Sequence, residues 1–209
     1  MKNFDITGRA VNLKLGLNLG CGQRLVTDHD GIHFINIDIN IPTDYRYAVE
    51  KNAEILVYDI RTGLHQTEDN SISFINMSQV FEHFNLAAGH NLLVECYRVL
   101  KSGAKIRISV PDAKLLIEKY LKSQMDEFVD VQPPIYKKVK SQMLKFGLIL
   151  FGAMFEHGDR GHKQAYDFEA LKELLEKVGF INIIRSDFND KYDSPAARNH
   201  QLAVEATRP

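Results

Sequence analysis

The chain has 209 residues, 44% of them hydrophobic and 25% charged, a length that suffices for one complete core but is short for two. Its 26 Lys and Arg residues against 27 Asp and Glu residues give a formal charge of −1, which argues against a general nucleic-acid binder. The longest apolar stretch, residues 146–155, is about half of the roughly 20 residues that a membrane-spanning helix needs. We therefore expect a single domain over residues 1–209, with neither nucleic acid nor membrane as a partner.

The two cysteines, Cys21 and Cys96, provide neither a disulfide framework nor the ligand spacing of a metal site. No pattern typical of a secretory signal precedes the first motif of the chain. Both observations favour a protein of the reducing cytoplasm.

Short apolar runs bounded by turn residues recur along the chain and are typical of buried strands. They lie at residues 13–19, 32–38, 53–58, 71–77, 104–110, 180–188 and 200–207. The first five read as parallel strands joined through helical patterns, whereas the last two are joined by a polar segment without helical periodicity. The sequence thus predicts an α/β fold: a doubly wound, mostly parallel seven-stranded sheet with an antiparallel last strand.

Two helices stand out in the pattern of apolar residues. Residues 87–103 carry an apolar face, and we expect Gly103 to end this helix. A second amphipathic helix begins after Asp167, a suitable N-cap, and ends at Gly179.

Residues 112–161 form a different kind of region, rich in apolar residues and lysines and without a strand pattern. We expect a helical insertion after the fifth strand that acts as a lid, with Ile135, Val139 and Phe146 on one helix face. The apolar run 146–155 would also suit burial against a second subunit, so a homodimer is a further expectation.

The first strand ends in the sequence LNLGCG, Leu17 to Gly22. In a doubly wound sheet, ligands bind beyond the carboxyl ends of the strands. Gly20 and Gly22 leave no side chains between the backbone and such a ligand. A tight turn would need the same glycines, so this loop by itself does not distinguish a ligand-binding loop from a simple turn.

Two acids at the ends of later strands favour binding. Asp38 ends the second strand sixteen residues after Gly22, near the spacing of about 20 at which an acid binds ribose hydroxyls. Asp59 ends the third strand and would face the same edge, although a helix N-cap explains it equally well. Leu25 replaces the third glycine of a dinucleotide loop. The pattern therefore favours a ligand with adenine and ribose but without phosphates, and argues against a nicotinamide-dependent oxidoreductase.

These motifs resemble those of the class I S-adenosylmethionine-dependent methyltransferases over nearly the whole chain. The resemblance includes LNLGCG, Asp38, Asp59, DNSISFINMSQVFEHF and LLVECYRVLKSGAKIRISVPD. The segments HKQAYDFEALKELLEKVGF and ARNHQLAVEA are similar to small bacterial methyltransferases of the type 11 kind, often associated with cell-surface saccharide biosynthesis. The resemblance implies a Rossmann-like enzyme that uses S-adenosylmethionine and releases S-adenosylhomocysteine. Its acceptor would be a small molecule, with a sugar or saccharide intermediate as one candidate.

The resemblance also assigns roles to individual residues. The glycine loop would line the methionine moiety, Asp38 would hold the ribose, Asp59 and Ile60 would flank adenine, and the end of the fourth strand would close the site. The implied cofactor-binding residues are Asn18, Leu19, Gly20, Cys21, Gly22, Asp38, Ile39, Asp59, Ile60, Ser78 and Gln79.

Histidines are the candidates for the catalytic base. Methyl transfer from a sulfonium is an in-line displacement in which positioning dominates, but a hydroxyl acceptor must also lose a proton. His162 is the first candidate because it precedes a helix in a glycine-containing loop from which it could reach over the cofactor. His83 is the second candidate, and packing beside Phe81 and Phe84 is the competing explanation for it.

Two alternatives remain open. The sequence QVFEH, Gln79 to His83, resembles the Glu-x-x-Glu-His motif of metal-binding ubiquinone-pathway and small-RNA methyltransferases, with Gln79 in place of the first acid. Because the missing carboxylate weakens a site for magnesium, we expect no metal. The alternative from another function class is a catalytically inactive S-adenosylmethionine-binding regulatory or scaffold protein, since the glycine loop and Asp38 fit both.

Overall fold

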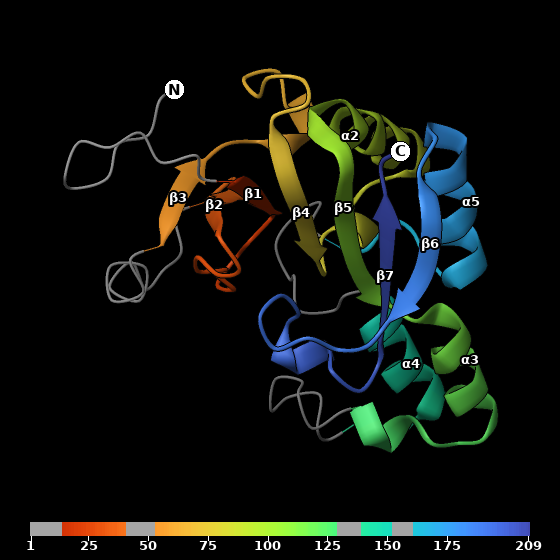
Figure 1. The fold of residues 1–209 in the computed structure, drawn as a ribbon. Helices are drawn as coiled ribbons and strands as arrows, with labels where there is room; N and C mark the ends of the chain where they lie inside the picture. Colours follow the sequence, from red (N-terminus) through yellow and green to blue (C-terminus); the bar gives the residue numbers. More distant parts are fainter. Residues whose placement is uncertain (1–13, 41–52, 129–138, 152–160) are drawn as a thin grey trace.

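The computed structural model describes residues 14–40, 53–128, 139–151 and 161–209 (Figure 1). One seven-stranded sheet has the strand order β3-β2-β1-β4-β5-β7-β6. The strands are β1 (Lys14–Leu19), β2 (Ile32–Asp38), β3 (Glu54–Val57), β4 (Ile72–Ser78), β5 (Leu100–Pro111), β6 (Ile181–Ser186) and β7 (Gln201–Thr207). The pairings from β3 to β5 are parallel, and β7 lies antiparallel between β5 and β6. The predicted sheet, including its antiparallel last strand, is confirmed.

One face of the sheet is covered by the helices α2 (Leu86–Val99) and α5 (Phe168–Val178), which pack side by side (Figure 1). The apolar side chains of both helices join those of the central strands in the main hydrophobic core. As predicted, the Asp167 carboxylate caps α5 by accepting from the Ala170 N–H, and Gly179 ends it with φ +109°.

The prediction that Gly103 ends the preceding helix is wrong. The helix α2 ends at Val99, because Leu100 pairs with Ile72 and begins β5. Gly103 lies within this long strand with φ +77°, and its N–H donates to the Arg208 carbonyl. The glycine therefore shapes a strand that is longer than the apolar run 104–110 indicated.

The other face of the sheet carries a row of buried polar side chains. Asn36 of β2, Asn18 of β1, Asn76 of β4 and Arg107 of β5 follow one another in register, and Glu205 of β7 continues the row. The Asn18 amide donates to Asn36 and accepts from the Asn76 amide, at 2.8 and 2.9 Å. These side chains thus link neighbouring strands.

The row also binds the backbone of two loops. Asn36 exchanges hydrogen bonds with the N–H and carbonyl of Val26, and Asn18 donates to the Arg24 carbonyl. Residues 20–31, which join β1 to β2, contain no helix. The backbone of a buried loop needs polar partners. The asparagines supply them and so hold the loop on the sheet, as apolar side chains would hold a helix.

The second loop, residues 187–200, is held mainly by Arg107. The guanidinium donates to the Asp193 carboxylate, with 3.1 Å between Nε and Oδ1, and to the Asp187 carbonyl. Asn76 donates to the Tyr192 carbonyl in the same loop. Arg107 and Asp193 are both 1% exposed or less, so this is a fully buried ion pair.

The insertion after β5 lies beyond the carboxyl ends of β5 and β6 (Figure 1). It contains α3 (Ala113–Leu121), the 3₁₀ turn η3 (Met125–Phe128) and α4 (Gln142–Leu150), which share a small core of their own. The helical insertion is confirmed. Ser141 caps α4, so Val139 precedes the helix, while Ile135 and residues 152–160 lie outside the described residues.

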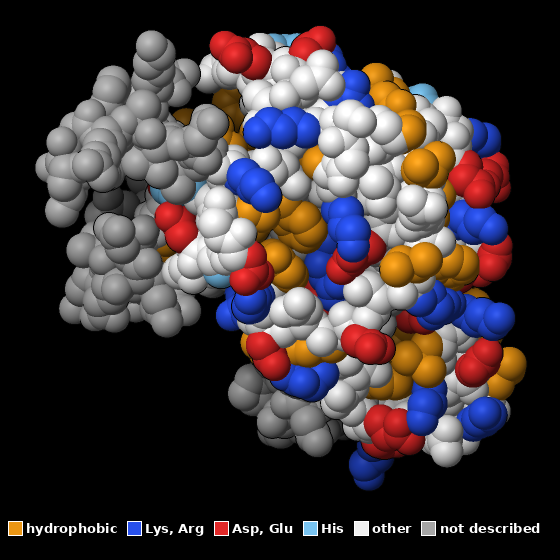
Figure 2. Space-filling model, viewed as in Figure 1, with side chains coloured by type: hydrophobic (Ala, Val, Ile, Leu, Met, Phe, Trp, Pro, Cys, Tyr) orange, Lys and Arg blue, Asp and Glu red, His pale blue; other side chains and the backbone are white. Residues whose placement is uncertain are grey.

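Shorter 3₁₀ turns follow two of the strands and precede another: η1 (Ile60–Thr62), η2 (Phe81–His83) and η5 (Pro195–Ala197). None of the described helices has the length and apolar character to cross a membrane. Figure 2 shows Lys and Arg side chains interspersed with Asp and Glu over the visible face, as expected for a chain of net charge −1.

Replacing Arg107 by methionine should destabilise the protein by about 3–5 kcal/mol, because it leaves Asp193 as an unpaired buried charge. Lys105→Met is the matched control, since Lys105 is half exposed and, among the described residues, forms an ion pair with Glu205 only. It should cost no more than about 1 kcal/mol. Urea unfolding of both variants measures the difference, and equal losses would contradict the assigned role of Arg107.

Candidate functional site

The two glycines of the first loop, Gly20 and Gly22, serve different structural purposes. Gly20 has φ +63°, and a Cβ there would lie 2.6 Å from the side chain of Val80, which follows β4. Gly22 has φ +48°, but a Cβ there would point into open space. Gly20 is therefore required by the turn and by packing, whereas Gly22 leaves exposed backbone that a ligand can approach.

Asp38 lies directly beside this loop. One carboxylate oxygen accepts from the Gly22 N–H at 2.8 Å, and the other accepts from the Asn40 N–H at 3.0 Å. The Cys21 N–H also donates to the Ile37 carbonyl, so the exits of β1 and β2 are joined. A carboxylate accepts about four hydrogen bonds, and Asp38 thus keeps capacity for a diol.

Three other predicted residues of the loop are buried. Both N–H donors of the Asn18 amide and its oxygen are used within the polar row, and Leu19 is in the core. Burial raises the pKa of the Cys21 thiol to about 12, so this cysteine is no nucleophile. The Asn18 side chain therefore positions the loop rather than offering a further hydrogen bond.

At the end of β3, the structure places Asp59 as the N-cap of η1. Its carboxylate also pairs with Arg61, which holds the pKa of Asp59 below its usual range. The N-cap alternative is thus observed. Ile60 packs into the core, and Ile39, after β2, is half exposed.

The end of β4 supplies Ser78 and Gln79. The Ser78 hydroxyl accepts from the Ser109 hydroxyl and from the Ser194 N–H, both at 3.0 Å. Gln79 has φ +58°, and its side-chain Nε2 is buried without a hydrogen-bond partner in the described part of the chain. An unpaired buried donor at this edge is typical of a group that meets a ligand.

The connection from β1 to β2 also bears on the kind of ligand. Because no helix begins in residues 20–31, no helix N-terminus is aimed at the glycine loop, and Leu25 packs against Cys21. A pyrophosphate would lack the site that dinucleotide-binding proteins offer it. This geometry argues against an oxidoreductase more strongly than the sequence does.

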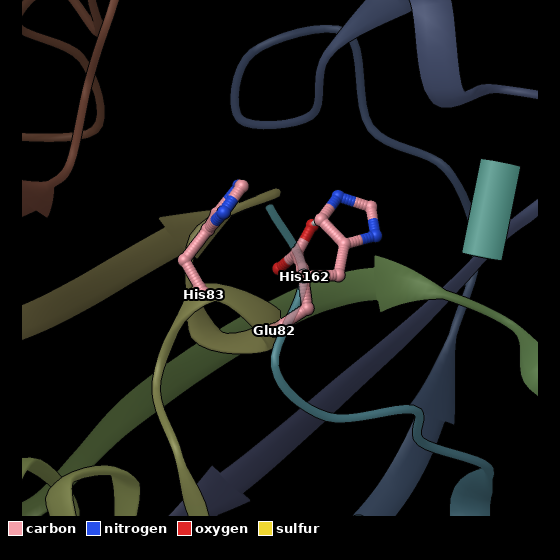
Figure 3. Close-up of side chains that lie close together, drawn as sticks. All are labelled: Glu82, His83 and His162. Carbon is pink, nitrogen blue, oxygen red and sulfur yellow. Dashed lines mark ion pairs between the residues drawn. The ribbon is translucent and has the colours of Figure 1, made fainter. Parts of the chain in front are cut away.

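The two candidate histidines lie together with Glu82 (Figure 3). Their ring centroids are 4.9 Å apart in an edge-to-face contact, and the Glu82 side chain reaches the same place. The Nε2 atom of His162 lies 3.9 Å from Glu82 Oε1. One potential ligand atom from each of the three residues lies within 4.8 Å of the others, so this group is able to hold a metal ion.

Burial dominates the electrostatics of this group. It raises the pKa of Glu82, which is 1% exposed, to about 8 and lowers the pKa of His162 to about 4. Neither oxygen of Glu82 has a hydrogen-bond partner in the described part of the chain. The buried Tyr166 hydroxyl lacks one as well, and its pKa rises to about 12 through burial and then through Glu82.

Sequence reasoning included Glu82 only in the metal-binding motif, from which it expected no metal, and it missed Tyr166 as part of the site. Glu82 had a signal, since a carboxylate between Phe81 and Phe84, on a turn after a buried strand, is placed for burial. Tyr166 had none, because a loop brings it to Phe81 through contacts distant in sequence, with 5.2 Å between ring centroids.

Replacing Glu82 by glutamine should remove a pH dependence of stability. The folded protein keeps this carboxyl protonated up to about pH 8, while the unfolded chain loses the proton above about pH 4.5. The folded state binds more protons in between, so this group lowers the free energy of unfolding as pH rises, by about 1.4 kcal/mol per pH unit.

Urea unfolding between pH 6.5 and 8, in buffer with a chelator, measures this slope. It should be less negative in Glu82→Gln than in the wild type, and unchanged in the control Glu118→Gln, since Glu118 is exposed. Parallel slopes for the wild type and Glu82→Gln would contradict a buried neutral carboxyl.

Comparisons with known proteins bear on the domain type and the fold of this chain. Residues 17–108 match a family model described as a methyltransferase domain. Among curated protein sequences, none matches this chain significantly.

Solved structures of methyltransferases share the fold at low sequence identity. A SAM-dependent methyltransferase from Archaeoglobus fulgidus is 18% identical, with 94% of this chain and 86% of that chain covered and a TM-score of 0.56. Phosphoethanolamine N-methyltransferase 2 of Haemonchus contortus, in complex with S-adenosyl-L-methionine, is 15% identical and has a TM-score of 0.59. The match covers 97% of this chain and 50% of that chain.

A third structure contains both an acceptor and the cofactor product. It is 1,6-didemethyltoxoflavin-N1-methyltransferase of Burkholderia thailandensis, with bound 1,6-didemethyltoxoflavin and S-adenosylhomocysteine. It is 13% identical, with 93% of this chain and 71% of that chain covered and a TM-score of 0.55. Residues 17–108 thus resemble a methyltransferase domain in sequence, and the chain shares its fold with solved S-adenosylmethionine-dependent methyltransferases.

Proposed function

We propose that this protein transfers a methyl group from S-adenosylmethionine to a hydroxyl group of a small polar molecule and releases S-adenosylhomocysteine. The observation that carries the proposal is the contact between Gly22 and Asp38. It joins exposed backbone after β1 to a carboxylate after β2, at the edge where doubly wound sheets bind their ligands.

The cofactor is the better supported half of the proposal. Asp38 would bind the ribose hydroxyls with its remaining acceptor capacity, and the exposed backbone at Gly22 would lie along the methionine part. The unpaired Gln79 amide would donate to the cofactor from the end of β4. Ile39 and Ile60 would offer apolar contacts to adenine beside Asp59, in keeping with their places after β2 and β3.

The part of the proposal that concerns the methyl acceptor rests on the polar side chains that follow β4. Val80 touches the glycine loop, and Glu82 and His83 follow it directly, so an acceptor beside them would lie near the methyl group. Holding the acceptor in line with the sulfonium can contribute about 7–11 kcal/mol in favourable cases. His162 and His83 would orient the acceptor hydroxyl. The lowered pKa of His162 makes it a weak base at neutral pH.

The finer features of the proposal follow from the sequence. A sugar or saccharide intermediate is the acceptor that the resemblance of the last third of the chain favours, and it carries the hydroxyls this site would use. The chain would act in the cytoplasm as a single domain, over which residues 112–161 form a lid. A homodimer through the apolar run 146–155 fits the exposed Leu144 and Phe151 of this insertion.

Replacing Asp38 by alanine should weaken binding of S-adenosylhomocysteine by roughly 1–3 kcal/mol, because ribose hydroxyls lose their acceptor. This corresponds to about 5- to 150-fold in Kd. Isothermal titration calorimetry measures the change, with NADH as the control ligand.

Asp30→Asn is the control variant, since Asp30 is exposed and pairs with Lys191 away from the glycine loop. Wild-type affinity in a folded Asp38→Ala protein would disprove the ribose assignment. Tight binding of NADH would instead revive the oxidoreductase alternative.

A further inference from the structure

We propose that Glu82, His83 and His162 bind a first-row divalent metal ion such as Zn²⁺, and that this ion binds the hydroxyl oxygen of the methyl acceptor. The first part stands on the geometry of the three side chains alone. The second part rests on the proposed function.

The three side chains already converge. One potential ligand atom from each lies within 4.8 Å of the others (Figure 3). With metal–ligand distances of 2.0–2.2 Å, ligand atoms on one tetrahedral ion are about 3.3 Å apart. The 3.9 Å between His162 Nε2 and Glu82 Oε1 is close to this value, so a small side-chain movement suffices.

Hydrogen bonding orients His162 as a ligand. Its Nδ1 lies 3.0 Å from the Leu150 carbonyl, which can only accept, so Nδ1 carries the proton and Nε2 presents a lone pair. That lone pair faces Glu82 Oε1, which is also an acceptor. His83 Nδ1 lies 3.4 Å from the Gly161 carbonyl. A backbone carbonyl on the second ring nitrogen is the usual support of a metal-bound histidine.

The buried carboxyl group of Glu82 supports the metal site independently of the histidines. Its carboxyl group is 1% exposed, and both of its oxygens lack a hydrogen-bond partner in the described part of the chain. The backbone fixes this position, because the Glu82 carbonyl accepts from the N–H groups of Lys163 and Gln164. These two unpartnered oxygens lie beside the lone pair of His162 Nε2, and a divalent cation between the two groups would be bound by both.

The donor set determines the class of ion. Two imidazoles and one carboxylate suit Zn²⁺ and neighbouring transition metals, whereas Mg²⁺ and Ca²⁺ prefer oxygen ligands. The carboxylate missing at Gln79, on which the expectation of no metal rests, matters for a hard ion such as Mg²⁺ and less for a site with two nitrogen ligands. Three protein ligands leave one position of a tetrahedral ion open to a water or substrate oxygen.

That open position would serve the proposed reaction. An ion bound there would lower the pKa of the acceptor hydroxyl, whose proton leaves to solvent. The hydroxyl oxygen then forms a bond to the methyl carbon as the carbon–sulfur bond breaks. The electron pair of the carbon–sulfur bond stays on sulfur, so the cofactor leaves as S-adenosylhomocysteine. Val80, which touches Gly20 of the cofactor loop, is two residues from Glu82, so the acceptor would be near the methyl group.

Calorimetric titration of chelator-treated protein with Zn²⁺ and with Mg²⁺ tests the site. We expect one Zn²⁺ per chain, bound at least tenfold more tightly than Mg²⁺, and a loss of tenfold or more in Glu82→Gln and in His162→Gln. His65→Gln is the control for surface histidines, because the His65 side chain is mostly exposed. The expected stability of Glu82→Gln keeps the test valid if His162→Gln fails to fold. Absence of stoichiometric Zn²⁺ binding, or equal binding by Glu82→Gln, would overturn the site.

A second measurement separates the metal site from the methyl transfer. In protein loaded with Co²⁺, the visible spectrum should show a tetrahedral ion and should change when catechol, as a hydroxyl probe, is added with S-adenosylhomocysteine. An unchanged spectrum would overturn the role in acceptor binding and leave the metal site intact. If S-adenosylhomocysteine does not bind to the wild type while Zn²⁺ does, the proposed function fails and the metal site stands.

Discussion

The structure depends on a row of buried polar side chains that crosses the sheet from Asn36 through Asn18 and Asn76 to Arg107. Buried amides and guanidinium groups need hydrogen-bond partners, and here neighbouring strands and two loops supply them, except for the Asn76 Oδ1 atom, which has none among the described residues. The row therefore explains an asymmetry of the fold. Helices cover one face over an apolar core, while loops 20–31 and 187–200 lie on the other face.

The same row places the candidate site. Asn18, Asn36 and Asn76 are mutual neighbours in the register of β1, β2 and β4. Two residues after each of them come Gly20, Asp38 and Ser78, which therefore reach the edge of the sheet together. A shift of one residue in any pairing would turn an asparagine toward the apolar face and move its strand exit. Fold and ligand site are thus fixed by one set of hydrogen bonds.

Beyond this edge, the protein buries a group that costs stability. Within the described residues, the carboxyl group of Glu82 has no hydrogen-bond partner, and it lies beside two histidines and the Tyr166 hydroxyl, which lacks a partner as well. Structures retain such unpaired polar groups mainly where a ligand or reaction needs them. The insertion takes part as well, since the Leu150 carbonyl at the end of α4 orients His162. Whatever binds here is therefore coupled to the helices that follow β5.

The sequence by itself determined most elements and the edge of the sheet that carries the candidate site. Apolar runs, caps such as Asp167 and the spacing of Gly22 and Asp38 are local signals, because strand periodicity and turn chemistry depend on neighbouring residues. It misplaced the end of α2, since Leu100 joins β5 only through pairing with Ile72, a contact between distant residues. The tertiary structure alone decided that the row of asparagines replaces helix packing, and that Glu82, His83 and His162 meet. Both depend on which strands become neighbours and on which loops return to them, and no local pattern encodes that choice.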